Sequence, residues 1–450
     1  MESTICALAS GQGGAVSLVR LSGPDALVIT HTLISKTVLL EPRHQTFCRI
    51  YDGKSVLDKA LVTYFKAPHS FTGEEVIEFA LHASPYITGR VLELLCQAGA
   101  VPARRGEFSQ RAFLNGKMDL VEAQGLCDII AAGNKASHRL AMASLDGKLS
   151  AKLEEIKQGL AELLAQIEVR LDDVDEEMTP LTPEFIHKQI SATLAHIKHL
   201  TDTFSVGKFI KDGLKVAIVG APNSGKSSLL NALVGFDRAI VADTCGTTRD
   251  TVEETLEING QKIILTDTAG IRQHALDLAE QEGMRRSIRA MEKADVILFV
   301  LDASRPLTLE EKQLWADIEH QQKRTLLVFN KSDKPIAEKI QLDHMSAYTQ
   351  LDVSCKKGTG ISQLKDTLTA PLNSSKDQDG LMISNLRHYE SLLRAQTELE
   401  SALIQINPET GGEIYAEHLR GALKHLKNLT GEVTPDDVLG IIFSKFCVGK

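Results

Sequence analysis

The sequence predicts a multidomain protein: an α+β domain first, then an all-α domain that is discontinuous, with an α/β domain inserted into it. Three observations favour this division. Strand-like and helical runs mix over residues 1–117, and leucines at helical spacing fill residues 149–167 and return over residues 392–426. Between these helical parts, strands alternate with amphipathic stretches from Lys215 to about Ala370, which is typical of a parallel sheet covered by helices. We expect domains at 1–117, 118–212, 213–372 and 373–450, the second and fourth forming one helical domain.

Composition limits the class of protein. A chain of 450 residues has room for about three domains, and 43% hydrophobic with 24% charged residues is ordinary for a soluble globular protein. No apolar run approaches the ~18 residues that span a bilayer, so we expect a cytoplasmic location and no membrane partner. The seven scattered cysteines form no C-x-x-C pair, which argues against a disulfide framework or a zinc site. The net charge of −9 argues against bulk attraction to nucleic acid, so any RNA contact needs a local basic patch or a partner protein.

In the first domain, apolar runs at 15–21, 61–65 and 76–81 predict strands, and the stretches 26–33 and 87–95 predict helices. Arg20 and Glu78 interrupt two of these strands. By spacing alone, each is most simply an outward-facing charge on a half-buried strand.

A stripe of leucine and isoleucine at helical spacing over residues 149–167 predicts the first long helix of the helical domain. The acidic run 172–177 ends this helix as a solvated connection, and Pro183 begins another that extends to about Phe204. Residues 373–380 read as a linker, after which helical spacing resumes. Neither helical part has an obvious partner except the other, which is why we expect one domain with an insertion.

The α/β domain opens on Lys215 to Leu230, KVAIVGAPNSGKSSLL. Val216 to Val219 predicts a buried strand, Gly220 to Ser227 spells G-x-x-x-x-G-K-S, and a helix follows. Glycines let successive backbone N–H groups face one anion, and the helix N-terminus adds positive potential. Lys226 would reach the β- and γ-phosphates, and Ser227 would hold Mg²⁺.

Four further motifs follow in the order that a guanine-nucleotide domain requires: Gly246-Thr-Thr-Arg-Asp250, Asp267-Thr-Ala-Gly270, Asn330-Lys-Ser-Asp333 and Ser354-Cys-Lys356. A carboxylate such as that of Asp333 only accepts hydrogen bonds, which suits the N1–H and N2–H donors of guanine. Adenine would leave it unpaired, which is costly. The motifs therefore predict GTP binding by Asn223, Ser224, Gly225, Lys226, Ser227, Ser228, Thr247, Thr248, Asp267, Thr268, Ala269, Gly270, Asn330, Lys331, Asp333, Ser354, Cys355 and Lys356.

One position departs from the Ras pattern, in which a glutamine after D-x-x-G orients the attacking water. Ile271 stands there and cannot polarise water. Hydrolysis must use another group, for which Asp277, Glu280 and Glu282 are the candidates. Arg249 and Arg272 are near enough in sequence to serve as an arginine finger, although such residues often face solvent.

The whole chain resembles the MnmE (also called TrmE) family of tRNA-modification GTPases. The marks are GQGGAVSLVRLSG, FTGEEVIEF and RRGEFSQRAFLNGKMDLVEAQ, then GAPNSGKSSLLN, GTTRD, DTAGIR and NKSD, and finally FCVGK. The resemblance implies an N-terminal tetrahydrofolate-binding domain that forms a homodimer, a discontinuous helical domain and an inserted Ras-like P-loop GTPase domain. It implies a partner, the FAD-carrying flavoprotein MnmG (GidA), in a heterotetramer. Together they would install a carboxymethylaminomethyl or aminomethyl group on C5 of the wobble uridine of certain tRNAs. The one-carbon unit would come from 5,10-methylene-tetrahydrofolate, for which the 5-formyl form is a binding probe.

The resemblance also implies residue roles. Folate would contact Arg20, Glu78, Lys117 and Lys450; Mg²⁺ would bind at Ser227 and Thr248; and K⁺ would bind at Asn223, Ala242, Thr244 and Thr247. The K⁺ ion would supply the charge that an arginine finger delivers elsewhere. Glu280 would orient the water, and Cys447 would take part in the modification chemistry.

Two departures from the family pattern limit this transfer. The segment before Glu280 is one residue longer than expected, which keeps Asp277 and Glu282 as candidates. His82-Ala-Ser-Pro85 replaces the usual H-G-G-P, which puts the nearby folate pocket in question. The alternative function is an Era- or Der-like GTPase switch in ribosome assembly, without one-carbon chemistry.

Overall fold

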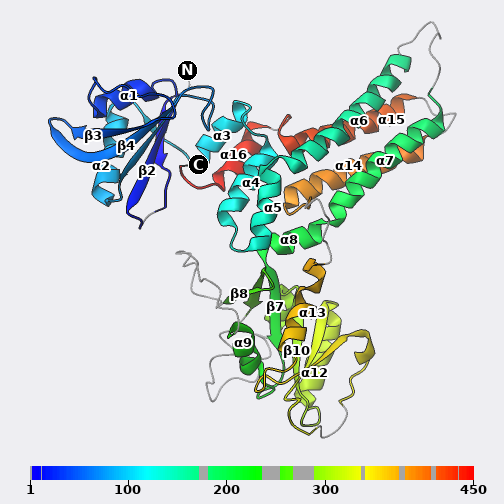
Figure 1. Cartoon of the computed structure of the whole chain (residues 1–450). Coiled ribbons are helices and arrows are strands. Elements are labelled where there is room, and N and C mark those ends of the chain that lie inside the picture. Colours follow the sequence, from blue (N-terminus) through cyan, green and yellow to red (C-terminus); the bar gives the residue numbers. More distant parts are fainter. Residues whose placement is uncertain are drawn as a thin grey trace. The chain divides into compact units, whose positions relative to one another are not determined.

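The structure, a computed structural model, describes residues 3–11, 13–171, 181–235, 254–266, 288–335, 340–373, 381–406, 412–433 and 435–449 (Figure 1). The chain divides into two compact units. The first holds Met1–Cys127, Ser144–Ile186 and Ser401–Lys450, and the second holds Asp128–Ala143 and His187–Glu400. Over the described ranges, no helix combines the length and the apolar character that crossing a membrane requires.

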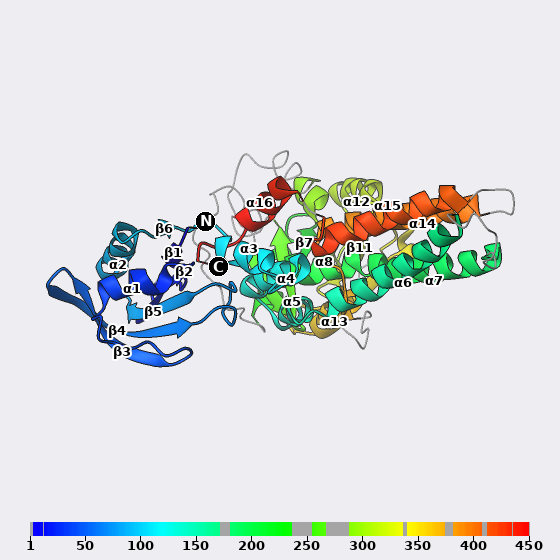
Figure 2. The ribbon, with the colours of Figure 1, turned by 90° about the horizontal axis from the view of Figure 1, so that it is seen from above.

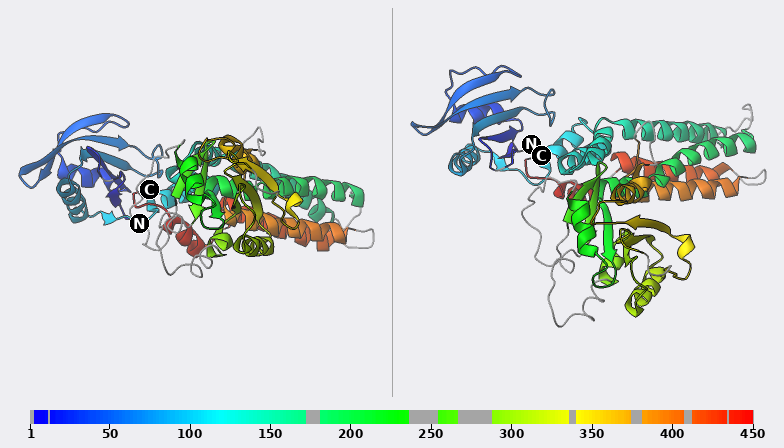
Figure 3. Two further views of the ribbon diagram at one scale, coloured as in Figure 1. Left: turned by 90° about the horizontal axis from the view of Figure 1, so that it is seen from below. Right: turned by 60° about the horizontal axis from the view of Figure 1, so that its bottom comes forward.

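The first unit begins with a six-stranded sheet of order β3-β4-β5-β2-β1-β6, in which β1 and β6 run parallel and the other neighbours antiparallel. Two further views of it, in blue, are given in Figure 3. Val19, Leu21 and Phe79 of one face share a core with α1 (Ala26–Leu33) and α2 (Pro85–Gln97). The strands are β1 (Ile5–Leu8), β2 (Val16–Ser22), β3 (Gln45–Asp52), β4 (Ser55–Phe65), β5 (Val76–His82) and β6 (Val101–Pro102).

The three strands and two helices predicted for this domain are confirmed, whereas β1, β3, β6 and the first half of β4 were not predicted. Part of the opposite face of the sheet carries α3 (Glu107–Leu114), whose Phe108 packs against Ile5 and Ala7 of β1. On β3 and β4 the same face is exposed, as at Phe47 and Leu61.

The helices of the first unit include α6 (Lys148–Leu171) and α15 (Gly412–Thr430), which lie side by side (Figures 1 and 2). The predicted apolar stripe of α6 is buried, except that Leu164 is only partly covered. Arg420 of α15 pairs with Glu168 of α6 at 2.8 Å, and the buried Lys157 ammonium bonds Glu432 just after α15. A second cluster joins Leu120 of α4 (Leu120–Ala131) to Phe443 of α16 (Asp436–Ser444).

The second unit contains α8 (Phe204–Asp212) and most of α5 (Lys135–Leu145), α7 (Pro183–Asp202) and α14 (Leu386–Gln405). Lys198 of α7 pairs with Glu400 of α14 at 2.9 Å. The rings of Phe204 and Tyr389 stack with their centroids 4.2 Å apart. The predicted helix from Pro183 ends two residues earlier than expected, at Asp202.

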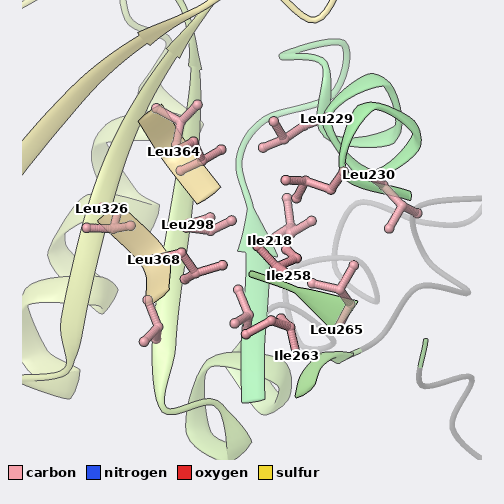
Figure 4. Close-up of a cluster of buried hydrophobic side chains, with 14 of the residues drawn as sticks. Ile218, Leu229, Leu230, Ile258, Ile263, Leu265, Leu298, Leu326, Leu364 and Leu368 are labelled. Carbon is pink, nitrogen blue, oxygen red and sulfur yellow. The ribbon is translucent and has the colours of Figure 1, made fainter. Parts of the chain in front are cut away.

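The α/β sheet of the second unit has the order β12-β11-β10-β7-β9-β8. The predicted parallel sheet is confirmed except at one edge, where β8 pairs antiparallel with β9 through a tight Asn259-Gly260 turn. One face packs on α9 (Lys226–Val234) and α13 (Ile361–Asn373), as in Figure 4, and the other on α12 (Leu309–Gln321). The strands are β7 (Leu214–Val219), β8 (Glu254–Ile258), β9 (Gln261–Thr266), β10 (Val296–Asp302), β11 (Arg324–Asn330) and β12 (Thr349–Val353).

Candidate functional site

The phosphate loop follows the buried strand β7 and ends where α9 begins at Lys226. Both of its framing glycines are required by close approaches of backbone and side chain. A Cβ on Gly220 would collide with the carbonyl oxygen of Val300, and one on Gly225 would collide with the side-chain amide of Asn330. Gly225 also has φ +100°, which L side chains rarely adopt. The loop can therefore wrap tightly and present its N–H groups to an anion.

Lys226 lies folded over this loop. Its Nζ donates to the carbonyl oxygens of Gly220 at 2.7 Å and Ala221 at 2.8 Å. Burial lowers the pKa of Lys226, and the nearby carboxylates Glu310 and Glu311 act against that shift. Ser224 is fully buried, and its Oγ has no hydrogen-bond partner among the described residues. A partly buried ammonium and a buried hydroxyl without a partner among the described residues, in one loop, fit an anionic ligand such as a nucleotide phosphate.

Asn330, at the end of β11, connects three parts of the predicted nucleotide site. It is 2% exposed, and its Nδ2 donates to the carbonyl oxygen of Ser224 at 3.0 Å. Its Oδ1 accepts from the backbone N–H of Cys355 at 3.3 Å. The phosphate loop, the N-K-S-D motif and the S-C-K motif are thus joined by one amide.

The carboxylate of Asp333 is half-buried beside the S-C-K loop. Ser354 donates its hydroxyl to Asp333 Oδ1 at 2.6 Å, and this bond, with Lys357 and Lys356 nearby, lowers the pKa of Asp333. Asp333 therefore stays ionised, which is the acceptor-only state that guanine recognition needs. Burial raises the pKa of the Cys355 thiol to about 11, so Cys355 contributes its backbone N–H rather than a thiolate.

Asp302 belongs to this site and sequence reasoning did not find it. It ends β10 directly opposite Asn330 in the sheet register. Its carboxylate accepts from Lys331 Nζ at 2.5 Å, and Lys331 also donates to the carbonyl oxygen of Asn223 at 2.9 Å. Burial would raise the pKa of Asp302, but the bonds from Lys331 and Ser304 outweigh it and the pKa is lowered. A lone aspartate at a strand end is no motif, and only the register with β11 reveals its role.

Of the remaining predicted nucleotide-binding and metal-binding residues, some lie within the described ranges and others lie outside them. Ser227 and Ser228 lie in the first turn of α9, and Lys356 is exposed beside Cys355. No group of three or more His, Cys, Asp or Glu side chains suited to a metal gathers within the ranges that the structure describes. Outside the described residues lie Ala242, Thr244, Thr247, Thr248, Arg249, Asp267, Thr268, Ala269, Gly270, Ile271, Arg272, Asp277, Glu280, Glu282 and Lys450.

In the N-terminal domain, Arg20 and Glu78 are directly paired across β2 and β5. Arg20 Nη2 lies 2.8 Å from Glu78 Oε1, and the two side chains are 15% and 21% exposed. They face away from the main core, as the spacing predicts, but Phe71 and Phe108 cover them: the Arg20 guanidinium lies 5.3 Å and 5.6 Å from the two ring centroids. Such an arginine is fixed and still has donors to offer a planar ligand.

The C-terminal segment reaches the same corner of the first unit. Arg20 Nη1 donates to the carbonyl oxygen of Gly449 at 3.3 Å, and the Gly106 N–H donates to that of Cys447 at 3.3 Å. The free thiol of Cys447 is exposed. Folate candidates and the cysteine candidate thus belong to one neighbourhood, which sequence spacing alone does not show.

Two further features of the N-terminal domain bear on the predicted folate pocket. Arg111, 7% exposed, bonds both Glu74 and Glu107, at 3.1 Å and 3.0 Å, and this network fixes the FTGEE segment against α3. The departure at His82-Ala-Ser-Pro85 joins the end of β5 to the start of α2, where Ser84 caps the helix by accepting from the Ile87 N–H. The helix start is therefore satisfied without the two glycines.

Comparison with known proteins gives consistent results. Residues 120–447 match the model of the MnmE helical domain, and residues 4–117 match that of the GTP-binding protein TrmE N-terminus. The proteins named tRNA modification GTPase MnmE from Aquifex aeolicus and Acinetobacter baylyi are each 39% identical to this chain; the alignments cover all of it and 100% and 97% of those proteins. The protein of that name from Bacteroides fragilis strain YCH46 is 37% identical over the full length of both chains. The chain belongs to the MnmE family.

Proposed function

We propose that the protein is a GTP hydrolase that acts in tRNA modification, on C5 of the wobble uridine. The observation that carries the nucleotide part is Asn330, because its amide joins the phosphate loop to the segments that hold Asp333 and Ser354. The tRNA part is supported by full-length relatives named tRNA modification GTPase MnmE. We propose the cytoplasm as its location and the domain boundaries 1–117, 118–212, 213–372 and 373–450, with the third domain inserted into the helical domain.

Each residue of the nucleotide site has its own role in phosphoryl transfer. Lys226 and the N–H groups of the loop hold the β- and γ-phosphates, and Ser227 and Thr248 hold Mg²⁺, which neutralises developing charge. Asn223 has φ +63°, and its carbonyl oxygen accepts a hydrogen bond from Lys331 Nζ. A side-chain amide oxygen suits a hard cation, so Asn223 binds K⁺ together with Ala242, Thr244 and Thr247. Glu280 orients the attacking water, with Asp277 and Glu282 as alternatives.

The modification half of the function belongs to the N-terminal domain and the C-terminal segment. Arg20, Glu78, Lys117 and Lys450 bind the tetrahydrofolate that supplies the one-carbon unit, and Cys447 takes part in the modification chemistry. The pairing of Arg20 with Glu78 and the approach of residues 447–449 to Arg20 and Gly106 support this assignment. The protein works as a homodimer with the FAD-carrying flavoprotein MnmG in a heterotetramer.

The ion requirement tests the hydrolytic mechanism. Replacing Na⁺ by K⁺ should raise GTP turnover on the order of 10²-fold or more, as expected when one preorganised charge-stabilising group is supplied. Asn223→Gly keeps the positive φ without strain and should abolish this stimulation while GTP affinity changes little. Equal turnover of the wild type in Na⁺ and K⁺ would remove the ion from the mechanism.

The modification chemistry needs a separate test. Cys447→Ser should leave GTP hydrolysis unchanged and abolish the modified wobble nucleoside, measured by mass spectrometry of tRNA after reaction with the flavoprotein partner. Full modification by the variant would leave the cysteine without a chemical role. If the protein is instead a GTPase switch in ribosome assembly, neither the wild type nor Cys447→Ser should give the modified nucleoside.

A further inference from the structure

A hollow of about 350 Å³ opens on the N-terminal domain, lined by Pro42 and Arg43 ahead of β3 and by Lys66, Ala67 and His69 after β4. Three of these five side chains are basic or can become so, and none is a carboxylate. Pro42 and Ala67 contribute apolar surface. Within the described residues, the Lys66 ammonium makes no ion pair. The chemistry of this lining favours an anion with an aliphatic body.

The loop that forms one wall of the hollow is held in place from several sides. The Lys117 ammonium donates to the carbonyl oxygen of Pro68 at 3.0 Å, and the Asn115 amide donates to that of Thr72 at 2.7 Å. On the other wall, the Arg43 N–H donates to the carbonyl oxygen of Tyr64 at 2.7 Å. The Arg43 guanidinium reaches across to the His69 carbonyl at 3.4 Å. Because both walls are tied down, a ligand would meet a preformed surface.

The same loop continues directly to the Arg20 corner. Phe71, whose ring centroid lies 5.3 Å from the Arg20 guanidinium, follows His69 by two residues, which places their Cα atoms within roughly 8 Å. Lys117 contacts this loop at two places, since a Cβ on Gly73 would lie 3.3 Å from Lys117 Cδ while Lys117 Nζ donates to the carbonyl oxygen of Pro68. A molecule bound at Arg20 can therefore extend an anionic tail along the loop to the hollow.

We propose that this hollow binds the γ-linked glutamate tail of a polyglutamylated tetrahydrofolate, an inference that rests on the folate binding proposed above. Each added glutamate brings one carboxylate on a short aliphatic link, which matches basic groups around apolar surface. Arg43 offers two parallel N–H donors to a carboxylate, and Lys66 and His69 offer single donors. The natural ligand class is thus the polyglutamate form of the cofactor rather than the monoglutamate.

Calorimetry with two chain lengths tests this. The full-length protein is titrated with 5-formyltetrahydrofolate carrying one or three γ-linked glutamates. We expect the triglutamate to bind about tenfold more tightly at low salt, since each exposed ion pair contributes only a few-fold. The gap should narrow at about 0.5 M salt, where such pairs are screened.

Variants locate the effect. Arg43→Gln with Lys66→Gln should reduce the triglutamate affinity to that of the monoglutamate and leave the monoglutamate affinity unchanged. The matched control is Arg49→Gln with Lys59→Gln, an exposed cross-strand pair on β3 and β4 with the same change of charge. It should keep the preference for the triglutamate.

The possible results separate the two proposals. If neither ligand binds the wild type, the folate assignment fails and this inference fails with it. If both bind with equal affinity, the folate assignment stands and the tail site alone is overturned. Loss of the triglutamate preference in the Arg49 and Lys59 control as well would assign the effect to net charge and likewise overturn the site.

Discussion

Asn330 donates a hydrogen bond to the backbone carbonyl oxygen of Ser224, 3.0 Å away, across 106 positions of sequence. The bond is buried, and it fixes the distance between the phosphate loop and the segment that would read the base. The guanine nucleotide proposed above would span these two places, so its affinity should depend on this distance.

Asn330→Ala should weaken GTP binding by about 1–3 kcal/mol, because it leaves the Ser224 carbonyl and the Cys355 N–H without their partner. Nucleotide affinity measured with a fluorescent GTP analogue checks this. Asn259→Ala is the matched control, since that amide bonds Asp366 and Thr369 of α13 away from the loop. It should lower the melting temperature and leave GTP affinity unchanged. Similar affinity losses in both variants would contradict the specific role of Asn330.

Asp333→Asn should change which base is preferred. The amide keeps one acceptor and gains donors, so GTP affinity should fall by about 1.5–3 kcal/mol while xanthosine triphosphate, which offers a carbonyl at C2, should bind better. Competition binding with both nucleotides measures the change. Asp302→Asn, which weakens the bond to Lys331, should lower both affinities together. Unchanged preference in Asp333→Asn would refute the base assignment.

Gly106→Ala should loosen the C-terminal segment. Gly106 has φ +68°, and an added Cβ would collide with the carbonyl oxygen of Phe443, so the variant should lose about 1–3 kcal/mol of stability. Trypsin should then cut after Lys445 faster than in the wild type, while GTP hydrolysis stays the same. Gly89→Ala is the control: it lies in α2 with open space around it and should stabilise by up to about 1 kcal/mol. An unchanged cleavage rate in Gly106→Ala would mean that other contacts hold the C-terminal segment in place.

His388 should make the second unit sensitive to acid. It is 5% exposed, its Nε2 has no hydrogen-bond partner among the described residues, and burial, with Arg387 and Lys211 nearby, lowers its pKa well below 6.5. Asp128 faces the same region but is paired with Lys211 at 2.8 Å. Below the ordinary histidine pKa, His388 binds a proton in the unfolded chain but not in the folded chain. The free energy of unfolding is therefore intact above that pKa and falls as the pH drops below it. The slope should reach about 1.4 kcal/mol per pH unit.

Urea unfolding at about pH 7.5 and about pH 5.5, followed by circular dichroism, measures this loss of stability. The two values lie on either side of the ordinary histidine pKa. His388→Gln cannot take up the proton and should lose less stability over the same interval. An identical loss in the variant would assign the acid sensitivity to other groups.

The phosphate loop was predictable because its chemistry is local: Gly220 to Ser227 carries strand end, turn and helix start in one run. Asp302 was not, because its role arises only when β10 and β11 align it with Asn330. Arg20 and Glu78 were each identified separately, but their pairing depends on the register of β2 against β5. β3 escaped prediction because its polar residues give it little apolar contrast, and its place is set by the hairpin with β4.

The bond from Arg20 to the Gly449 carbonyl joins residues 429 positions apart. A ribosome that adds about 5–20 residues per second needs about 20–90 s to make that stretch of chain. Once Glu78 has also been made, Arg20 of the nascent protein can pair with it, but for the rest of this interval there is no Gly449 to contact. The corner that holds Arg20, Gly106 and Cys447 is therefore completed only after the GTP-binding domain has been synthesised, so a nascent chain can acquire its nucleotide site before it acquires this one.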